Sequence, residues 1–110
     1  MAFRRAMRGI IEEIHGKGRV EKWVYYDKAG EVYGYPSQVE VDVLIKNGAH
    51  ILVDVKAGAS IGDVSTLWRK GRLYERITGT KPRLVIITPF IDKEAQEAAA
   101  KQGVKVYTRV

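Results

Sequence analysis

The stretch Val39–Lys56, with the sequence VEVDVLIKNGAHILVDVK, decides the fold of this chain. It consists of two runs rich in Val, Ile and Leu that are separated by Asn47-Gly48. Apolar runs bounded by turn residues are typical of buried β-strands, and Asn-Gly is a strong hairpin signal. The stretch therefore predicts two largely buried strands that are joined by a hairpin.

The two predicted strands carry charged residues that need a physical explanation. Glu40 and Asp42 lie in the first run, and Asp54 and Lys56 lie in the second. Ionised groups are rarely buried unless they are paired or bound to a metal. A divalent-cation site explains these charges best. The alternative is an ordinary cross-strand ion pair between Glu40 and Lys56 on a solvated face of the sheet.

The cation site requires a particular hairpin register, because side chains alternate between the two faces along a strand. Asp42 lies opposite Asp54, and Glu40 opposite Lys56, only if the loop comprises the three residues Asn47–Ala49. A two-residue turn would send the two aspartates to opposite faces of the sheet. We therefore predict a three-residue loop.

Helical and strand patterns flank the hairpin on both sides. Apolar residues at helical spacing predict an amphipathic helix from about residue 2 to about residue 15. Ser60 and Asp63 resemble a capping box that opens a helix of about fifteen residues, which Gly79 ends. A further helix is predicted from Asp92 to about Gln102, and strands are predicted at Val20–Tyr26, Glu31–Tyr35, Leu84–Thr88 and Val104–Thr108.

The helix that follows Ser60 carries an apolar stripe that we expect to pack on the sheet. Gly71 lies within this stripe and indicates a close approach of helix and sheet. A helical connection of this length permits a right-handed crossover to a parallel strand, so the order of elements predicts an α/β sandwich with a mixed sheet. The stripe consists of Val64, Leu67, Trp68, Gly71, Tyr74 and Ile77.

The length and composition place limits on the class of protein. A chain of 110 residues corresponds to one domain. It has no cysteine, which excludes disulfides and thiolate metal sites, and only two histidines, which disfavours zinc. An oxygen-liganded cation remains compatible with the composition. Few Asn, Gln and Met residues beside many Arg, Lys, Glu, Val and Ile residues are compatible with a thermophilic source.

The chain is basic, with 19 Lys and Arg residues against 13 Asp and Glu residues and a net charge of +6. A basic small domain suits a polyanion, either nucleic acid or an anionic membrane surface. No apolar run approaches the ~18 residues of a membrane span, and the first residues lack the apolar core of a signal peptide. We therefore expect a cytoplasmic chain that does not span a membrane.

Asp42, followed across the hairpin by Asp54-Val55-Lys56, resembles the motif of the PD-(D/E)XK nuclease superfamily. Nearly the whole chain is similar to an uncharacterised, mostly archaeal family of nuclease-like domains. The resemblance implies a restriction-endonuclease-like αβββαβ core with a mixed sheet, extended by a C-terminal helix and strand, in one domain of residues 1–110. The resembling segments are VEVDVLIKNG, ILVDVKAGAS, DVSTLWRKGRLYERITGTKPR, LVIITPFID and AAAKQGVKVY.

The same resemblance implies metal-dependent hydrolysis of phosphodiester bonds, with DNA favoured over RNA. Asp42, Asp54 and the backbone carbonyl of Val55 are expected to bind Mg²⁺ or Mn²⁺, which helps to activate water. Lys56 is expected to position that water and to stabilise the transition state as a charged group. The alternative is a catalytically inactive module of the same fold that binds nucleic acid or assembles with a protein. A homodimer is compatible with the nuclease and with the inactive module.

The first helix of the superfamily usually supplies a glutamate to the site. Glu13 lies on the flank of the apolar stripe of the first predicted helix and can face the site. Glu40 is the other candidate for this role. The alternative, which we favour, is that Glu13 is a solvated surface acid.

Basic residues recur at helical spacing on the helix after Ser60. Arg69, Arg72 and Arg76 follow one another at intervals of three and four residues, beside Lys70. This arrangement predicts a basic ridge that contacts phosphates. The alternative is a solvated helix face that is partly paired with Glu75.

Overall fold

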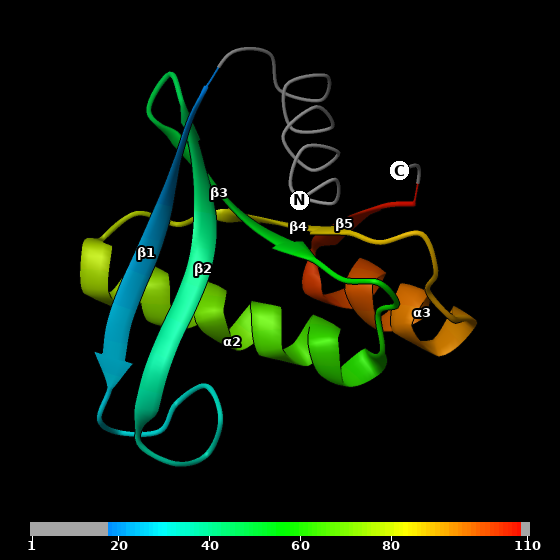
Figure 1. Ribbon diagram of the computed structural model, residues 1–110, viewed down its shortest axis with the longest axis horizontal. Coiled ribbons are helices and arrows are strands. Elements are labelled where there is room, and N and C mark those ends of the chain that lie inside the picture. The colour runs from blue at the N-terminus through cyan, green and yellow to red at the C-terminus, as the bar shows by residue number, and fades with distance from the viewer. Residues whose placement is uncertain (1–17, 109–110) are drawn as a thin grey trace.

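The computed structural model describes residues 18–108, which form a five-stranded sheet with two helices (Figure 1). The helix that we expect from residue 2 to residue 15, and with it Glu13, lies outside the described residues. The elements are β1 (Arg19–Asp27), β2 (Ser37–Lys46), β3 (Ala49–Val55), α2 (Ile61–Thr78), β4 (Arg83–Ile87), α3 (Lys93–Gln102) and β5 (Val104–Tyr107).

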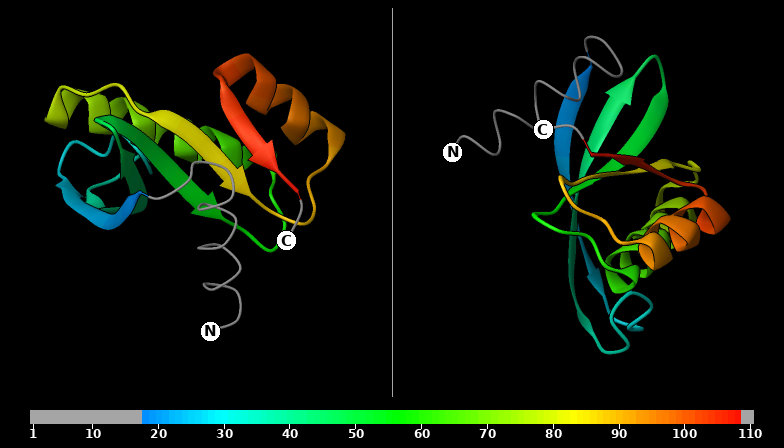
Figure 2. Two further views of the ribbon diagram at one scale, coloured as in Figure 1. Left: turned by 90° about the horizontal axis from the view of Figure 1, so that it is seen from above. Right: turned by 90° about the vertical axis from the view of Figure 1, so that its right-hand side faces the viewer.

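The sheet is mixed, and its spatial order β1-β2-β3-β4-β5 follows the chain. β1, β2 and β3 are antiparallel neighbours, whereas β3, β4 and β5 are parallel. Parallel neighbours need a long crossover connection, which α2 and α3 supply. Both helices lie on the same side of the sheet (Figure 2) and contribute to one core. The predicted α/β architecture, including the added C-terminal helix and strand, is confirmed.

Local signals in the sequence set the two ends of α2. The Ser60 hydroxyl accepts a hydrogen bond from the Asp63 N–H, and the Asp63 carboxylate accepts one from the Ser60 N–H at 2.8 Å. These two bonds satisfy N–H groups that have no partner within the helix. Gly79 ends the helix in the left-handed conformation with φ 78°. The predicted capping box and C-terminus are therefore confirmed.

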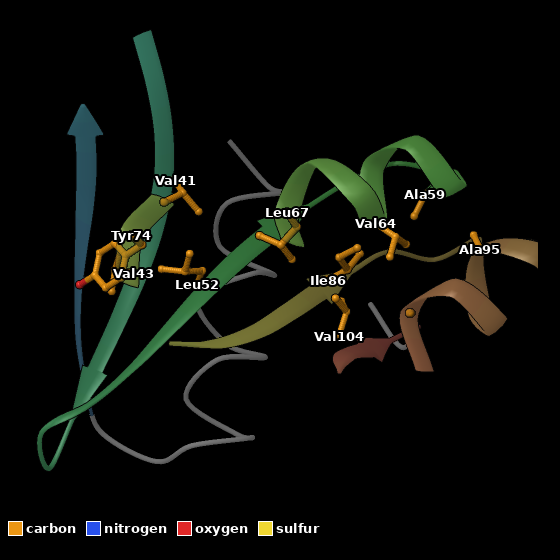
Figure 3. Close-up of a cluster of buried hydrophobic side chains, with 11 residues drawn as sticks. Val41, Val43, Leu52, Ala59, Val64, Leu67, Tyr74, Ile86, Ala95 and Val104 are labelled. Carbon is orange, nitrogen blue, oxygen red and sulfur yellow. The ribbon is translucent and has the colours of Figure 1, made fainter. Parts of the chain in front are cut away.

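The main core lies between α2 and the sheet (Figure 3). Leu67 is 1% exposed and packs with the strand residues Leu52 and Ile86, which are fully buried. Gly71 allows the helix to lie close to β4, because a Cβ at this position would stand only 2.7 Å from Cδ2 of Leu84. The predicted apolar stripe stops short of Ile77, which is 37% exposed on the last turn of α2.

The predicted strand at Glu31–Tyr35 is wrong, because this segment forms a loop between β1 and β2. Gly30 and Gly34 have φ values of 70° and 85°, which are not compatible with an extended strand. The buried carboxylate of Asp27 accepts a hydrogen bond from the N–H of Val32 at 2.9 Å. This hydrogen bond and the two glycines give the segment a loop conformation that its Val and Tyr residues did not reveal.

Gly71→Val is expected to destabilise the protein by about 1–3 kcal/mol, because the added side chain overpacks the contact with Leu84. Urea unfolding measures the difference. Gly62→Val is the matched control on the first turn of α2, where the nearest atom to a new Cβ is 3.6 Å away. This control should change the free energy of unfolding by less than about 0.5 kcal/mol. Equal losses in the two variants would contradict the close approach at Gly71.

Candidate active site

The hairpin between β2 and β3 closes with a two-residue turn. Asn47 and Gly48 have φ values of 52° and 78°, the positive pair that a type I′ turn requires. Lys46 consequently pairs with Ala49. The predicted three-residue loop is therefore wrong. Asn and Gly both adopt the left-handed conformation at low cost, so the tight turn that matches the twist of the strands forms.

This register sends Asp42 and Asp54 to opposite faces of the sheet. Asp42 lies opposite Val53, which belongs to the cluster on the face away from α2. Asp54 pairs with Ile86, which belongs to the core beneath α2. The predicted direct pairing of Asp42 with Asp54 is wrong, because a shift of one residue changes the face of every side chain.

The two aspartates nevertheless lie at one point of the sheet, where β2 and β3 part. The pair Asp42–Val53 is the last of the β2–β3 ladder. Beyond it β2 continues beside β1, and β3 continues beside β4 as far as Val55 (Figure 1). We call this point the fork. The negative charge of Asp42 contributes to the raised pKa of the Asp54 carboxyl group.

Asp54 occupies the most perturbed electrostatic position at the fork. Burial raises the pKa of its carboxyl group above the ordinary value of 3.8, because a carboxylate loses hydration there. Lys56 and Lys70 oppose this rise, whereas Asp63 adds to it. A half-buried acid between two cations is typical of a functional position, although structural ion networks also perturb pKa values.

Lys56 follows β3 directly and pairs with Asp63 instead of the predicted Glu40. Its Nζ lies 3.9 Å from Oδ1 of Asp63, and its backbone N–H donates to the carbonyl of Ile87 at 3.0 Å. The predicted pairing of Glu40 with Lys56 is therefore wrong. The side chain of Glu40 is exposed and accepts a hydrogen bond from Gln38 at 3.2 Å.

Lys70 joins α2 to the fork. Its Nζ donates a hydrogen bond to the backbone carbonyl of Glu40 at 2.8 Å, and its charge lowers the pKa of Asp54. Lys70 and Asp63 are seven residues apart, which places them on the same side of the helix two turns apart. Sequence reasoning treated Lys70 only as a phosphate contact and Asp63 only as a cap. Their seven-residue spacing was the signal in the sequence that could have placed both side chains on one side of α2.

The other predicted phosphate contacts have separate surroundings. Arg76 forms an ion pair with Glu31, at the far end of α2 from Asp63. The guanidinium of Arg72 lies over the ring of Trp68 at 5.0 Å from its centroid. Arg69 is exposed. The arginines of the predicted basic ridge therefore have different surroundings.

The two acids of the fork have ligand chemistry that suits a divalent cation, although the register places them on opposite faces of the sheet. Asp54 and Asp42 offer hard oxygen ligands, and a cation would offset the charge that burial disfavours at Asp54. Val55, whose carbonyl is the predicted third ligand, is the last residue of β3 and adjoins Asp54. Among residues 18–108, no group of three or more His, Cys, Asp or Glu residues is placed to hold a metal.

A family model described as the PD-(D/E)XK nuclease superfamily matches residues 37–105, a segment that includes Asp42, Asp54 and Lys56. The chain belongs to this superfamily. A second family model, described as a protein of unknown function (DUF3782), matches residues 1–36. No curated protein matches the chain.

Two solved structures have a fold similar to that of this superfamily member. One is a repair endonuclease from Pyrococcus abyssi, with a TM-score of 0.59 and 19% identity over 96% of this chain and 46% of that chain. The other is EndoMS in its apo form, with a TM-score of 0.62 and 15% identity over 96% of this chain and 45% of that chain. This chain spans less than half the length of either protein. The likeness supports the restriction-endonuclease-like fold.

No helix in the described part of this superfamily member is long and apolar enough to cross a membrane.

Asp54→Asn is expected to stabilise the protein at neutral pH in EDTA. Because the folded state raises the Asp54 pKa, the folded protein holds this proton more tightly than the unfolded chain does. Ionising Asp54 therefore costs stability as the pH rises from the ordinary value of 3.8 through the raised pKa. The gain from the substitution should grow over this range, as measured by urea unfolding at several pH values.

The matched control for this measurement is Glu97→Gln, which removes the same charge from an exposed position on α3. It should give no gain that grows with pH. A gain at Asp54 that stays constant over the range would contradict the burial of this carboxyl group as its cause.

Proposed function

We propose that the chain is a metal-dependent nuclease domain that hydrolyses phosphodiester bonds, with DNA as its substrate. The observation that carries this proposal is the position of Asp54 and Lys56. Both follow the superfamily motif, and both lie at the fork, where burial raises the pKa of Asp54 and four charged neighbours, Lys56 among them, also shift it. Perturbed carboxylates of this kind are candidates for catalysis when they gather with defined charge partners.

In this proposal, Asp42 and Asp54 hold Mg²⁺ or Mn²⁺, together with the backbone carbonyl of Val55. The bound cation supplies a Lewis acid that neutralises charge on the phosphate and lowers the pKa of water. Asp54 is suited to this role because partial burial leaves its carboxylate incompletely hydrated. Asp42 is suited to it by its place at the last pair of the ladder.

Lys56 is proposed to orient the attacking water and to stabilise the negative charge that develops on the phosphate. Its Nζ is only loosely paired with Asp63, at 3.9 Å, and its side chain is 41% exposed. An incoming phosphate can therefore reach the ammonium group. Lys70 holds the backbone of Glu40 on the other side of the fork and is proposed to position β2 against α2.

DNA is proposed as the substrate because the chain has a net charge of +6 and its fold resembles that of a protein described as a repair endonuclease. Glu40, the predicted substitute for the first-helix glutamate, remains a candidate through the face that it shares with Asp42. A homodimer is proposed as the assembly, because two sites would allow cleavage of both strands of a duplex.

Asp54→Asn and Lys56→Ala are expected to abolish or strongly reduce cleavage of branched, double-stranded and single-stranded DNA in Mg²⁺ or Mn²⁺. Loss of a group that stabilises the transition state typically costs about 10²–10³-fold in rate. Both variants should still bind DNA in gel-shift experiments. Lys93→Ala and Glu97→Gln, at exposed positions on α3, are the controls and should retain the parent rate.

A catalytically inactive nuclease-fold module is the second candidate function. The register of the hairpin favours it, because Asp42 and Asp54 leave the ladder on opposite faces. Such a module would bind DNA and show no cleavage in either metal. Cleavage by the parent chain that resists both substitutions would contradict the assigned site instead, since another group would then carry the reaction.

A further inference from the structure

A cleft of about 510 Å³ lies away from the fork. It is lined by α2, by the segment that leads into β4, by the end of α3 and by β5. Asp54 and Lys56 lie at the C-terminal end of β3, whereas the cleft includes Lys81 and Arg83, where the parallel strand β4 begins. The arrowheads of β3, β4 and β5 point toward the same end of the sheet (Figure 2, left). The aromatic and basic side chains that line the cleft include Trp68, Arg72, Lys81, Arg83, Lys105 and Tyr107.

The cleft is positively charged. Arg72, Lys81, Arg83 and Lys105 line it, and Glu75 is the one acid among its lining residues in the described part of the chain. The ion pairs within residues 18–108 involve three other basic residues, and none involves these four cations. Within residues 18–108, four cations beside a single acid give the cleft an excess of positive charge that attracts an anion, and Arg and Lys bind phosphate through charge-assisted hydrogen bonds.

Two aromatic rings line the cleft, each beside one of the cations: Trp68 lies on α2, and Tyr107 lies at the end of β5, where it packs against the cluster on the face of the sheet away from α2. The Arg72 guanidinium stands 5.0 Å from the centroid of the Trp68 ring, and Nζ of Lys105 stands 5.2 Å from that of Tyr107. Both rings are half-buried, so packing restricts their positions. An aromatic ring beside a cation is the arrangement that stacks a nucleobase and binds its phosphate at the same time.

We propose that this cleft binds a nucleoside phosphate unit, supplied by an unpaired stretch of a nucleic-acid strand. The volume lies within the range of about 300–1,000 Å³ of small-molecule sites, which suits one nucleotide. An unpaired strand presents both a free base face for the rings and a phosphate for the cations, whereas a duplex hides its base faces. The inference rests on the proposed function only in taking nucleic acid as the ligand. It requires no cleavage.

Tryptophan fluorescence tests the proposal with the full chain in EDTA. The chain has two tryptophans, and the second, Trp23, packs against Tyr25 and Tyr74 outside the cleft. Titration with a twelve-residue oligothymidylate is expected to quench the parent protein, and Trp68→Phe should lose most of that change. A blunt duplex and inorganic phosphate should leave the fluorescence nearly unchanged.

A charge-matched pair of variants separates the cleft from general basicity. Arg72→Ala/Arg83→Ala is expected to weaken oligothymidylate binding by about 10-fold or more and to lower the salt slope by about 2, one for each lost phosphate contact. Lys93→Ala/Lys101→Ala removes the same charge from exposed positions on α3 that do not line the cleft. This control should weaken binding by less than about 3-fold. Circular dichroism verifies that each variant is folded.

The outcomes distinguish this proposal from the proposed function. Equal weakening by the two double variants would overturn the cleft as a site. Equal affinity for thymidine monophosphate and for the oligothymidylate would overturn the strand as the source and assign the cleft to a free nucleotide. Because oligothymidylate binding is measured in EDTA and needs no cleavage, a parent chain that binds the oligothymidylate but does not cleave DNA would count against the nuclease proposal alone.

Discussion

The two-residue turn at Asn47-Gly48 is the constraint on which the rest of the structure depends. It sets the register of β2 against β3, and this register decides which residues of the hairpin face α2. Leu52 enters the core beneath the helix, and Asp54 follows it on the same face. Side chains alternate between the two faces along a strand, so the turn sets the face of every residue in β3. It therefore also places the charged side chain of Asp54 on the face beneath α2.

The fork shows how the fold accommodates that charge. Asp54 stands where β2 leaves β3. The charges of Lys56, which follows β3, and of Lys70 and Asp63 on α2 act on it. The desolvation that raises the pKa of Asp54 also lowers the stability of the folded protein at neutral pH. A residue that served packing alone would not carry this cost. A neutral side chain would be cheaper there. This cost is consistent with the proposed catalytic role of Asp54.

The basic residues of the described part have different surroundings. Some pair with carboxylates, as Arg76 does with Glu31, and contribute modestly to stability as exposed ion pairs. Others, such as Arg72 and Lys105, stand over aromatic rings without an acidic partner. In the proposed cleft, two of the cations therefore stand beside aromatic rings, and this combination favours a nucleotide over a simple ion.

The sequence by itself determined the elements from β1 to β5, apart from the strand wrongly expected at Glu31–Tyr35, together with the caps of α2 at Ser60 and Gly79 and the presence of the superfamily motif. These follow from local signals, since caps, turn residues and apolar periodicity act over a few residues. Only the tertiary structure decided the faces of Asp42 and Asp54, the pairing of Lys56 with Asp63 and the place of Lys70. Each depends on which strand residue lies opposite which, and a single-residue difference in a turn, invisible to periodicity, reverses every face.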